Sequence, residues 1–263
     1  MVTGRFCYVD IFCQLVATQL IVAYRQFADM VINLYIWVFC SLVIMGYIMQ
    51  SFGLAADYGC FQLASTIGTV GLFEVYGNIT KNVMDFDGDR TISYYLTLPT
   101  KPWVVFGSFV AFYAFIGTVL SCLVFPFGKL ILYNSFDLSH VSFVKSMIII
   151  VLSNIFFGVF TLLVTTHVGT MSKVRNVWSR FILPLWMLGA FQFSWAVVYK
   201  ISAPLAYVML CNPVVFIMEG CRAALLGQAD YLSWWICCGA LIFYIIISWF
   251  YMLYKMKRLL DIV

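Results

Sequence analysis

Residues 146–172 read SMIIIVLSNIFFGVFTLLVTTHVGTMS and contain no Asp, Glu, Lys or Arg. A bilayer core of about 30 Å is crossed by roughly 20 apolar residues in a helix. A helix is needed because lipid offers no partner for unpaired backbone groups. This stretch is therefore predicted to be a membrane-spanning helix.

Similar charge-free stretches recur along the chain, although one of them must continue past Glu74 to about Asn78 to cross a membrane. The composition agrees, since 64% of residues are hydrophobic and only 10% are charged, against about 25% charged in ordinary soluble domains. The sequence predicts an all-α polytopic membrane protein, with residues 1–263 as one domain. Its six spans are expected at about 30–50, 58–78, 103–125, 145–167, 181–199 and 232–254.

Basic residues set the predicted orientation, because Lys and Arg are retained on the cytoplasmic side during insertion. With the N-terminus inside, only four of the 15 basic residues lie outside, namely Lys129, Lys145, Lys200 and Arg222. Residues 201–218 are also uncharged, but Pro204 and Pro213 interrupt them, and a seventh span would send the basic tail at Lys255 outside. Residues 200–230 are therefore predicted to form an external re-entrant segment, with both termini cytoplasmic.

The first residues, about 5–25, are predicted to form an interfacial helix ahead of the first span. At about 100° per residue, the polar side chains of this region fall within an arc of roughly 100°. Such a helix lies along the membrane surface. A frayed apolar leader is the alternative, and the continuous polar stripe argues against it. The stripe consists of Asp10, Gln14, Thr18, Arg25 and Asp29.

Several enzyme motifs are absent from the sequence. It contains no GxxxxGK[ST] phosphate loop, no GxSxG and no HExxH, which excludes the nucleotide-hydrolysing, serine-hydrolase and zinc-protease classes that depend on them. His140 and His167 are expected at opposite ends of the fourth span, and the nine cysteines show no CxxC spacing. No catalytic residue, bound cofactor or metal site is predicted. Cys211 and Cys221 could pair if the external segment folds back.

The predicted cytoplasmic connection 81–102, KNVMDFDGDRTISYYLTLPTKP, holds the densest charge in the chain. Loops of this length are often functional. Residues 89–98 are expected to form a short helix with Ile92, Tyr95 and Leu96 on one side. A solvated hairpin is the alternative. An apolar face on the cytoplasmic surface needs a cover, and a partner protein is predicted to supply it.

Residues 212–227, NPVVFIMEGCRAALLG, predict a helix with its own start and stop. Asn212 can cap it, Pro213 suits the first turn and Gly227 can end it. About 14 residues at 1.5 Å each reach only about 21 Å, which is too short to span.

Two charges within this segment are also notable. Glu219 and Arg222 are three residues apart, so they are expected to pair at membrane depth. The alternative is that this pair only allows the segment to sit in the interface. Glu74 is the other candidate site residue, as the one acid inside a full predicted span.

These segments resemble the permease subunits of type-2 ABC exporters, a family that includes drug, lipid, nodulation-factor and polysaccharide exporters. The resemblance covers nearly the whole chain. It is most specific at Asn212-Pro213 with the EGCR and LG motifs that follow. It also rests on the N-terminal surface helix, on the loop from Gly88-Asp89-Arg90-Thr91 to Leu98-Pro99, and on FILPL at 181–185.

The resemblance implies that two permeases pair, as a homodimer, and that each docks a separate ATP-binding subunit, present in two copies. ATP and Mg would act in that partner, so this chain would have no ATPase activity of its own. A bacterial inner membrane, contact with membrane lipid and no nucleic-acid partner are implied. Ile92 and Ser93 stand where the family's loop often has an acid. The implied ATPase-coupling residues are Asp87, Gly88, Asp89, Arg90, Thr91, Tyr95, Leu96 and Pro99.

ATP binding in the partner would shift the permease pair between inward-facing and outward-facing states. The cargo would be an amphiphile such as a lipid, glycolipid or drug-like molecule, with lipid-linked polysaccharide as the alternative. A secondary transporter should show repeats and charges in several spans, whereas Glu74 is alone here. An integral membrane transferase should show clustered acids or histidines. A purely structural subunit stays open.

Overall fold

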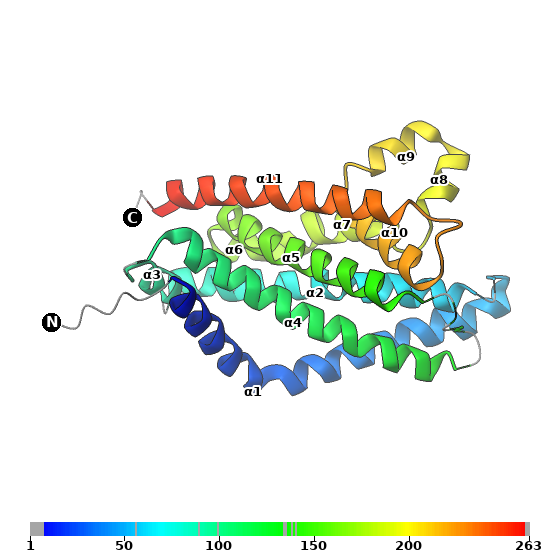
Figure 1. Cartoon of the computed structure of the whole chain (residues 1–263), viewed down its shortest axis with the longest axis horizontal. Helices are drawn as coiled ribbons and strands as arrows, with labels where there is room; N and C mark the ends of the chain where they lie inside the picture. Colours follow the sequence, from blue (N-terminus) through cyan, green and yellow to red (C-terminus); the bar gives the residue numbers. More distant parts are fainter. Residues whose placement is uncertain are drawn as a thin grey trace.

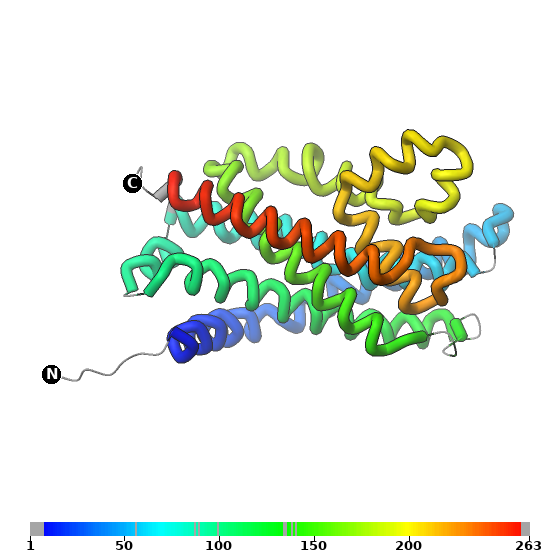
Figure 2. The backbone as a smooth tube through the Cα atoms, turned by 45° about the horizontal axis from the view of Figure 1, so that its top comes forward, coloured from blue at the N-terminus to red at the C-terminus, as the bar shows by residue number. Residues whose placement is uncertain are grey.

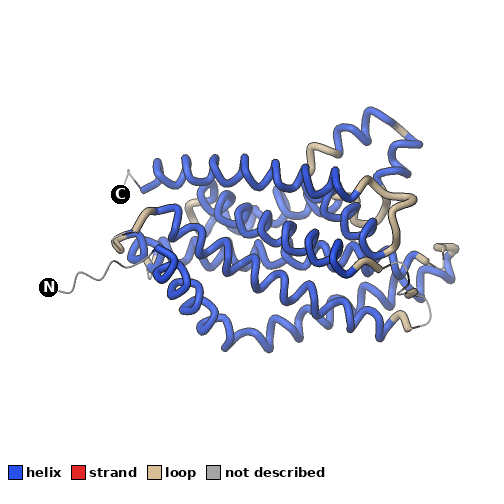
Figure 3. Tube along the Cα trace, in the orientation of Figure 1, coloured by secondary structure: helices blue, strands red, loops and turns tan. Residues whose placement is uncertain are grey.

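The computed structural model describes residues 8–55, 57–88, 90–98, 100–133, 136–137, 139 and 141–260, and gives only the backbone of Asp87, Leu259 and Leu260. Three residues named above, Asp89, Pro99 and His140, lie outside the described residues. Helices and their connections make up all of the described chain, and no strand occurs within it (Figure 3).

Long helices form a bundle (Figure 1). They are α1 (Tyr8–Val43), α2 (Tyr58–Asp87), α4 (Pro102–Ile131), α5 (Phe143–Val168) and α11 (Trp234–Leu260). Shorter helical pieces connect or extend them. These are η1 (Ile44–Ile48), η2 (Met49–Phe52), α3 (Thr91–Leu96), α6 (Met171–Val177), η3 (Trp178–Ile182), α7 (Leu183–Met187), α8 (Trp195–Ile201), α9 (Ala203–Met209) and α10 (Pro213–Leu225).

Within the described residues, four helical segments are long and apolar enough to cross a membrane. A fifth candidate arises if α9 and α10, which meet at an angle of 98°, count as one broken span. Large apolar side chains such as Ile36, Ile246 and Phe250 are exposed on α1 and α11. Surface of this kind is suited to lipid contact, so the structure is compatible with an integral membrane protein. The four segments are Tyr8–Phe52, Pro102–Ile131, Phe143–Val168 and Trp234–Arg258.

The central helix of the bundle is α2, which packs against α4, α5 and α10. It is 30 residues long, yet its hydropathy does not mark it as a span, because it carries several polar side chains. These side chains face neighbouring helices rather than the outer surface. The buried polar residues of α2 are Gln62, Ser65, Thr66, Thr69 and Asn82.

Glycines allow α2, α4 and α5 to approach one another closely. A Cβ atom at Gly117 of α4 would lie 2.2 Å from Oδ1 of Asn154, and one at Gly71 of α2 would lie 2.3 Å from the same atom. Small residues at helix contacts permit such close approach, which is how helices pack tightly in membranes. The two glycines therefore set the spacing at the centre of the bundle.

The N-terminal helix corrects the prediction of a separate interfacial element. Residues 8–43 form one helix, and η1 and η2 carry it on to Phe52, so no break separates the predicted surface helix from the first span. Its 45 residues would extend about 68 Å if straight, about twice the bilayer core. The helix changes direction along its length (Figure 1). Near its start, Leu15 is buried in a cluster with Phe106 of α4.

The predicted fifth span, residues 181–199, is also corrected. Helix α7 ends at Met187 and α8 begins at Trp195, and residues 188–194 between them are not helical. Helices α8 and α9 stand out from the bundle beside α10 (Figure 1). The segment that leaves the bundle therefore begins before the predicted residue 200.

The bundle has two distinct ends (Figures 1 and 2). At one, here the α3 end, lie the start of α1, helix α3 and the end of α11. At the other, here the α10 end, lie η2, α8 and the start of α11. The first and last described residues are thus on the same side as the connection that holds α3.

Candidate functional site

Helix α10 begins and ends where the sequence predicts. The Asn212 Oδ1 atom accepts a hydrogen bond from the backbone N–H of Val214 at 3.0 Å, and Pro213 occupies the first turn. The helix ends at Leu225, and Gly227 follows with φ of +104°, a conformation that favours glycine. At 13 residues, α10 is about 20 Å long.

The surroundings of α10 are protein on all sides. Every residue from 214 to 225 is buried, and the helix packs against α2, α5 and α11. A helix lying in a membrane interface would leave one face exposed. The burial therefore contradicts the alternative in which the segment merely sits in the interface.

Glu219 and Arg222 form the predicted ion pair, with Oε1 and Nη1 3.2 Å apart and both side chains 0% exposed. It is the one ion pair among the described residues. The Glu219 Oε1 atom also accepts the backbone N–H of Trp195 at 2.9 Å, and Oε2 accepts that of Leu232 at 3.1 Å. The carboxylate thus joins α10 to the start of α8 and to the connection before α11.

The Arg222 guanidinium extends this network to α2 and to the loop 188–194. Its Nε and Nη2 atoms donate to the Ser65 hydroxyl at 3.2 and 2.7 Å. Its Nη2 donates to the carbonyls of Ala190 and Phe191 at 2.5 and 3.0 Å, and Nη1 donates to that of Phe193 at 3.0 Å. The buried cation is therefore surrounded by acceptors as well as by its carboxylate partner.

This network explains why the predicted fifth span is broken. A carbonyl inside an α-helix accepts the N–H four residues later, whereas the carbonyls of Ala190, Phe191 and Phe193 lie in a non-helical loop and accept Arg222 instead. Ala190 adopts φ of +62° to do so, a conformation that costs a non-glycine residue about 1–3 kcal/mol. From the sequence, Arg222 was predicted to pair with Glu219 alone, and its contacts with the loop were not predicted.

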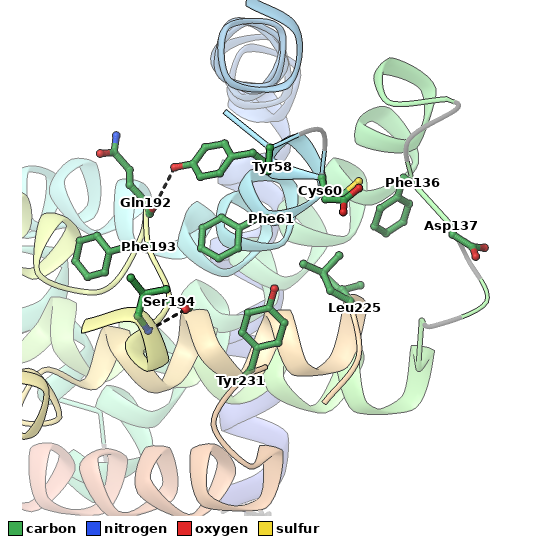
Figure 4. A pocket seen from close by; sticks show the side chains of 14 residues that line it. Tyr58, Cys60, Phe61, Phe136, Asp137, Gln192, Phe193, Ser194, Leu225 and Tyr231 are labelled. Carbon is green, nitrogen blue, oxygen red and sulfur yellow. Dashed lines mark hydrogen bonds between the residues drawn. The ribbon is translucent and has the colours of Figure 1, made fainter. Parts of the chain in front are cut away.

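A cavity of about 670 Å³ lies beside the ion pair at the α10 end (Figure 4). The Phe61 ring separates the two, since its centre is 3.7 Å from the Arg222 guanidinium carbon. The Tyr58 hydroxyl donates to the carbonyl of Gln192 at 2.8 Å. Burial raises the pKa of the Tyr231 phenol, and the charge of Arg222 partly offsets this. Aromatic rings and two acids make up half of the cavity lining, namely Tyr58, Phe61, Phe136, Phe193, Tyr231, Asp57 and Asp137.

Aromatic faces of this kind can stack on a flat apolar group or on the apolar face of a sugar ring. The carboxylates and hydroxyls at the edges can accept or donate hydrogen bonds. The lining is thus suited to a partly polar ligand.

Cys211 and Cys221, considered as a pair from the sequence, are both free thiols. Cys211 is exposed, whereas Cys221 is buried inside α10. A Cβ atom placed on Gly68 of α2 would lie 3.2 Å from the Cys221 sulfur. Cys221 therefore faces the bundle, and the disulfide is not present.

The predicted short helix of the cytoplasmic connection is present as α3. The Asp85 carboxylate accepts the backbone N–H groups of Thr91 and Ile92, each at 2.8 Å, and so satisfies two donors at the start of the helix. Arg90 makes the turn before it with φ of +52°. This role of Asp85 was not predicted from the sequence, although a carboxylate ahead of a helix start is the expected capping signal.

The apolar face of α3 corrects one prediction. Ile92 is 2% exposed, and Tyr95 and Leu96 are half-buried beside it against α4. The chain therefore covers this face itself, and no partner protein is needed there. Burial raises the pKa of the Tyr95 phenol, and the charge of nearby Asp85 raises it further, so Tyr95 is neutral at physiological pH.

The remaining implied coupling residues are placed as follows. Gly88 and Arg90 are exposed and Thr91 is half-buried, while the Asp87 side chain, Asp89 and Pro99 lie outside the described residues. The large exposed side chain of α3 is Tyr94, at 63%. Its exposure was not predicted because Tyr94 and Tyr95 look equivalent in sequence. Only the packing of α3 against α4 shows which of the two tyrosines is exposed.

Glu74 lines a second cavity, of about 310 Å³, between α1, α2, α3 and α4. Lys81 Nζ donates to Gln26 Oε1 at 3.0 Å within the same lining. None of the hydrogen bonds among the described residues involves the Glu74 carboxylate. The cavity was missed because Gln19 and Gln26 belong to the part of α1 that was predicted to lie on the membrane surface.

Geometry and residue pattern are the basis for assigning a function to these sites. Comparison of the chain with models of protein families, with curated proteins and with solved structures finds no match.

Proposed function

We propose that this chain is the permease subunit of a type-2 ABC exporter, which moves an amphiphilic molecule across a membrane while a separate subunit hydrolyses ATP. The observation that carries the proposal is the placement of α3 and α10 at opposite ends of the bundle. A short, partly exposed helix at one end can receive a partner. At the other end lies α10, a buried helix that is too short to span. The resemblance to the permeases of type-2 ABC exporters rests on these same two segments.

The proposed topology has six crossings with both termini cytoplasmic in a bacterial inner membrane. Helices α1, α2, α4, α5 and α11 each make one crossing. The helical run 171–187 would extend about 26 Å, and with the loop 188–194 it makes the fifth. The α3 end is then cytoplasmic, as the distribution of Lys and Arg favours.

The proposed docking surface for the ATP-binding subunit is the exposed face of α3. Arg90 and Tyr94 lie on this face. Ile92 and Tyr95 pack on the opposite face and attach α3 to the bundle. Movement of the partner would therefore be transmitted to α2 and α4, and two copies of the permease would pair around the path of the cargo.

The proposal is tested by producing the chain together with a candidate ATP-binding subunit from the same source and measuring complex formation and phosphate release. The chain alone should release no phosphate, and the complex should. Tyr94→Ser should weaken the complex roughly 30-fold, because truncation of an aromatic anchor costs about 2 kcal/mol. Tyr133→Ser is the matched control, since Tyr133 is a 75% exposed tyrosine at the α10 end. Phosphate release by the chain alone, or equal weakening by both variants, would contradict the proposal.

Lipid-linked polysaccharide is the alternative cargo, and the aromatic cavity at the α10 end favours it. Rings such as Tyr58 and Tyr231 could stack on sugars as they leave the membrane. Vesicles loaded with a lipid-linked glycan or with the same lipid lacking sugar would separate the two cargoes. Tyr231→Ala should slow transport of the glycan only. Equal slowing of both would argue against a sugar site.

A further inference from the structure

The cavity that contains Glu74 differs in character from the aromatic cavity at the α10 end. Its walls come from α1, α2, α3 and α4, and apolar side chains such as Met30, Phe112 and Ile116 line it together with polar ones. Its volume of about 310 Å³ is within the range of small-ligand sites. A lining of this mixed kind suits a molecule with a polar head and an apolar tail.

Gln19 is the first indication that the cavity has an occupant. Both polar atoms of its side-chain amide are buried and lack a hydrogen-bond partner among the described residues. A buried polar atom left without a partner is unfavourable, because it has lost its hydrogen bonds to water. The amide lies in the cavity lining, so a ligand that both donates and accepts hydrogen bonds would satisfy it.

The charges in the lining indicate the chemistry of that ligand. Asp85 already accepts the two N–H groups at the start of α3, and Lys81 already donates to Gln26. Among the described residues, no hydrogen bond or ion pair reaches the Glu74 carboxylate, so this acid keeps its hydrogen-bonding capacity. A half-buried carboxylate without an ion-pair partner is stabilised by a cation that binds it directly.

We infer that this cavity binds the amine-bearing head of an amphiphile, with the ammonium group on Glu74, the Gln19 amide on neighbouring polar atoms of the head, and the tail between α1 and α4. The inference rests on the proposed function in one respect, since it takes such an amphiphile as the cargo. Thr91 and Ile92 of α3 also line the cavity. A bound head therefore lies directly beneath the proposed docking helix.

The test uses the purified chain alone in a neutral detergent, so a negative result leaves the transport proposal standing. Dodecylamine, dodecanol and dodecanoate share one tail and differ only in the head. Dodecylamine should raise the unfolding temperature in a saturable manner, and the other two should not. Lysophosphatidylethanolamine is the second amine, because it separates a membrane lipid from a simple amine. Stabilisation by either amine supports an ammonium site, and stabilisation by the lipid alone identifies a phospholipid head.

Two variants and one crosslinking experiment test whether the amine binds in this cavity. Glu74→Gln should weaken the apparent affinity for the amine at least roughly tenfold, as expected for a lost charged hydrogen bond. Asp57→Asn, at the α10 end, should leave it unchanged. On the unaltered chain, an alkylamine with a diazirine in its tail should crosslink to residues 18–30 or 109–116. Equal stabilisation by dodecanol, an unchanged affinity in Glu74→Gln, or crosslinks confined to other helices would overturn the inference.

Discussion

Replacing Glu219 by glutamine removes one charge from the buried network and leaves its shape almost unchanged. The glutamine keeps one acceptor oxygen, while its NH₂ group faces the N–H donors that the carboxylate now accepts from Trp195, Leu232 and Arg222. Removing one member of a buried ion pair costs about 3–5 kcal/mol. Arg222 keeps the Ser65 hydroxyl and three backbone carbonyls as acceptors. We therefore expect the lower end, about 3 kcal/mol.

The assay is reversible unfolding of the purified chain by sodium dodecyl sulfate, followed by circular dichroism. Glu74→Gln is the matched control, because Glu74 and Glu219 are the two glutamates of the chain and no hydrogen bond among the described residues reaches the Glu74 carboxylate. Its free energy of unfolding should change by less than about 1 kcal/mol. A loss in Glu219→Gln no larger than in this control would refute the reasoning.

The double variant Glu219→Gln with Arg222→Gln measures the coupling between the charges. It removes the uncompensated cation, but it also leaves the loop carbonyls of Ala190, Phe191 and Phe193 without their donor. Its loss should therefore exceed that of Glu219→Gln and fall below the sum of the single variants by about 2 kcal/mol. Strict additivity would mean that the two side chains act independently.

Three further outcomes are expected. Gly117→Ala should destabilise the bundle by about 1–3 kcal/mol in the same unfolding assay, and adding Asn154→Ala should restore part of the loss; no change in the single variant would contradict the close approach. Asp85→Asn should weaken the start of α3 by about 1 kcal/mol and speed trypsin cleavage after Arg90. In a cysteine-free background, an impermeant thiol reagent added to intact cells should label a cysteine at Tyr207 and spare one at Lys257; the reverse pattern would invert the proposed topology.

Local signals in the sequence predicted two of the short helices, α3 and α10, well. Asn212, Pro213 and Gly227 act within a few residues of the helix that they begin or end, so their effect can be read without knowing the fold. The spacing of Glu219 and Arg222 likewise fixes their contact on any helix. The same reasoning located α3 between Gly88 and Pro99 to within a few residues.

The predictions that failed concern segments whose structure depends on contacts with residues far away in the sequence. Residues 181–199 are apolar enough to be read as a span, but the carbonyls of Ala190, Phe191 and Phe193 bind Arg222 from a non-helical loop. Arg222 is far from this loop in sequence, so no local sequence pattern predicts its contact with the loop carbonyls. The polar stripe at the start of α1 suggested a helix separate from the first span, whereas the two form one continuous helix, in which Leu15 packs in the bundle and Gln19 and Gln26 line a cavity.

The capping contact of Asp85 and the contact of Arg222 with Ser65 have a joint mechanical consequence, because both are made to α2. Between Ser65 and Asp85 this helix is unbroken, and 20 residues of helix measure about 30 Å. This rigid helix therefore links α3 to α10. If α2 tilted by about 5° around one of these contacts, the other contact would move by about 2.6 Å, given that length. A small movement at the α3 end of the bundle would thus reach the α10 end as a displacement large enough to separate packed side chains.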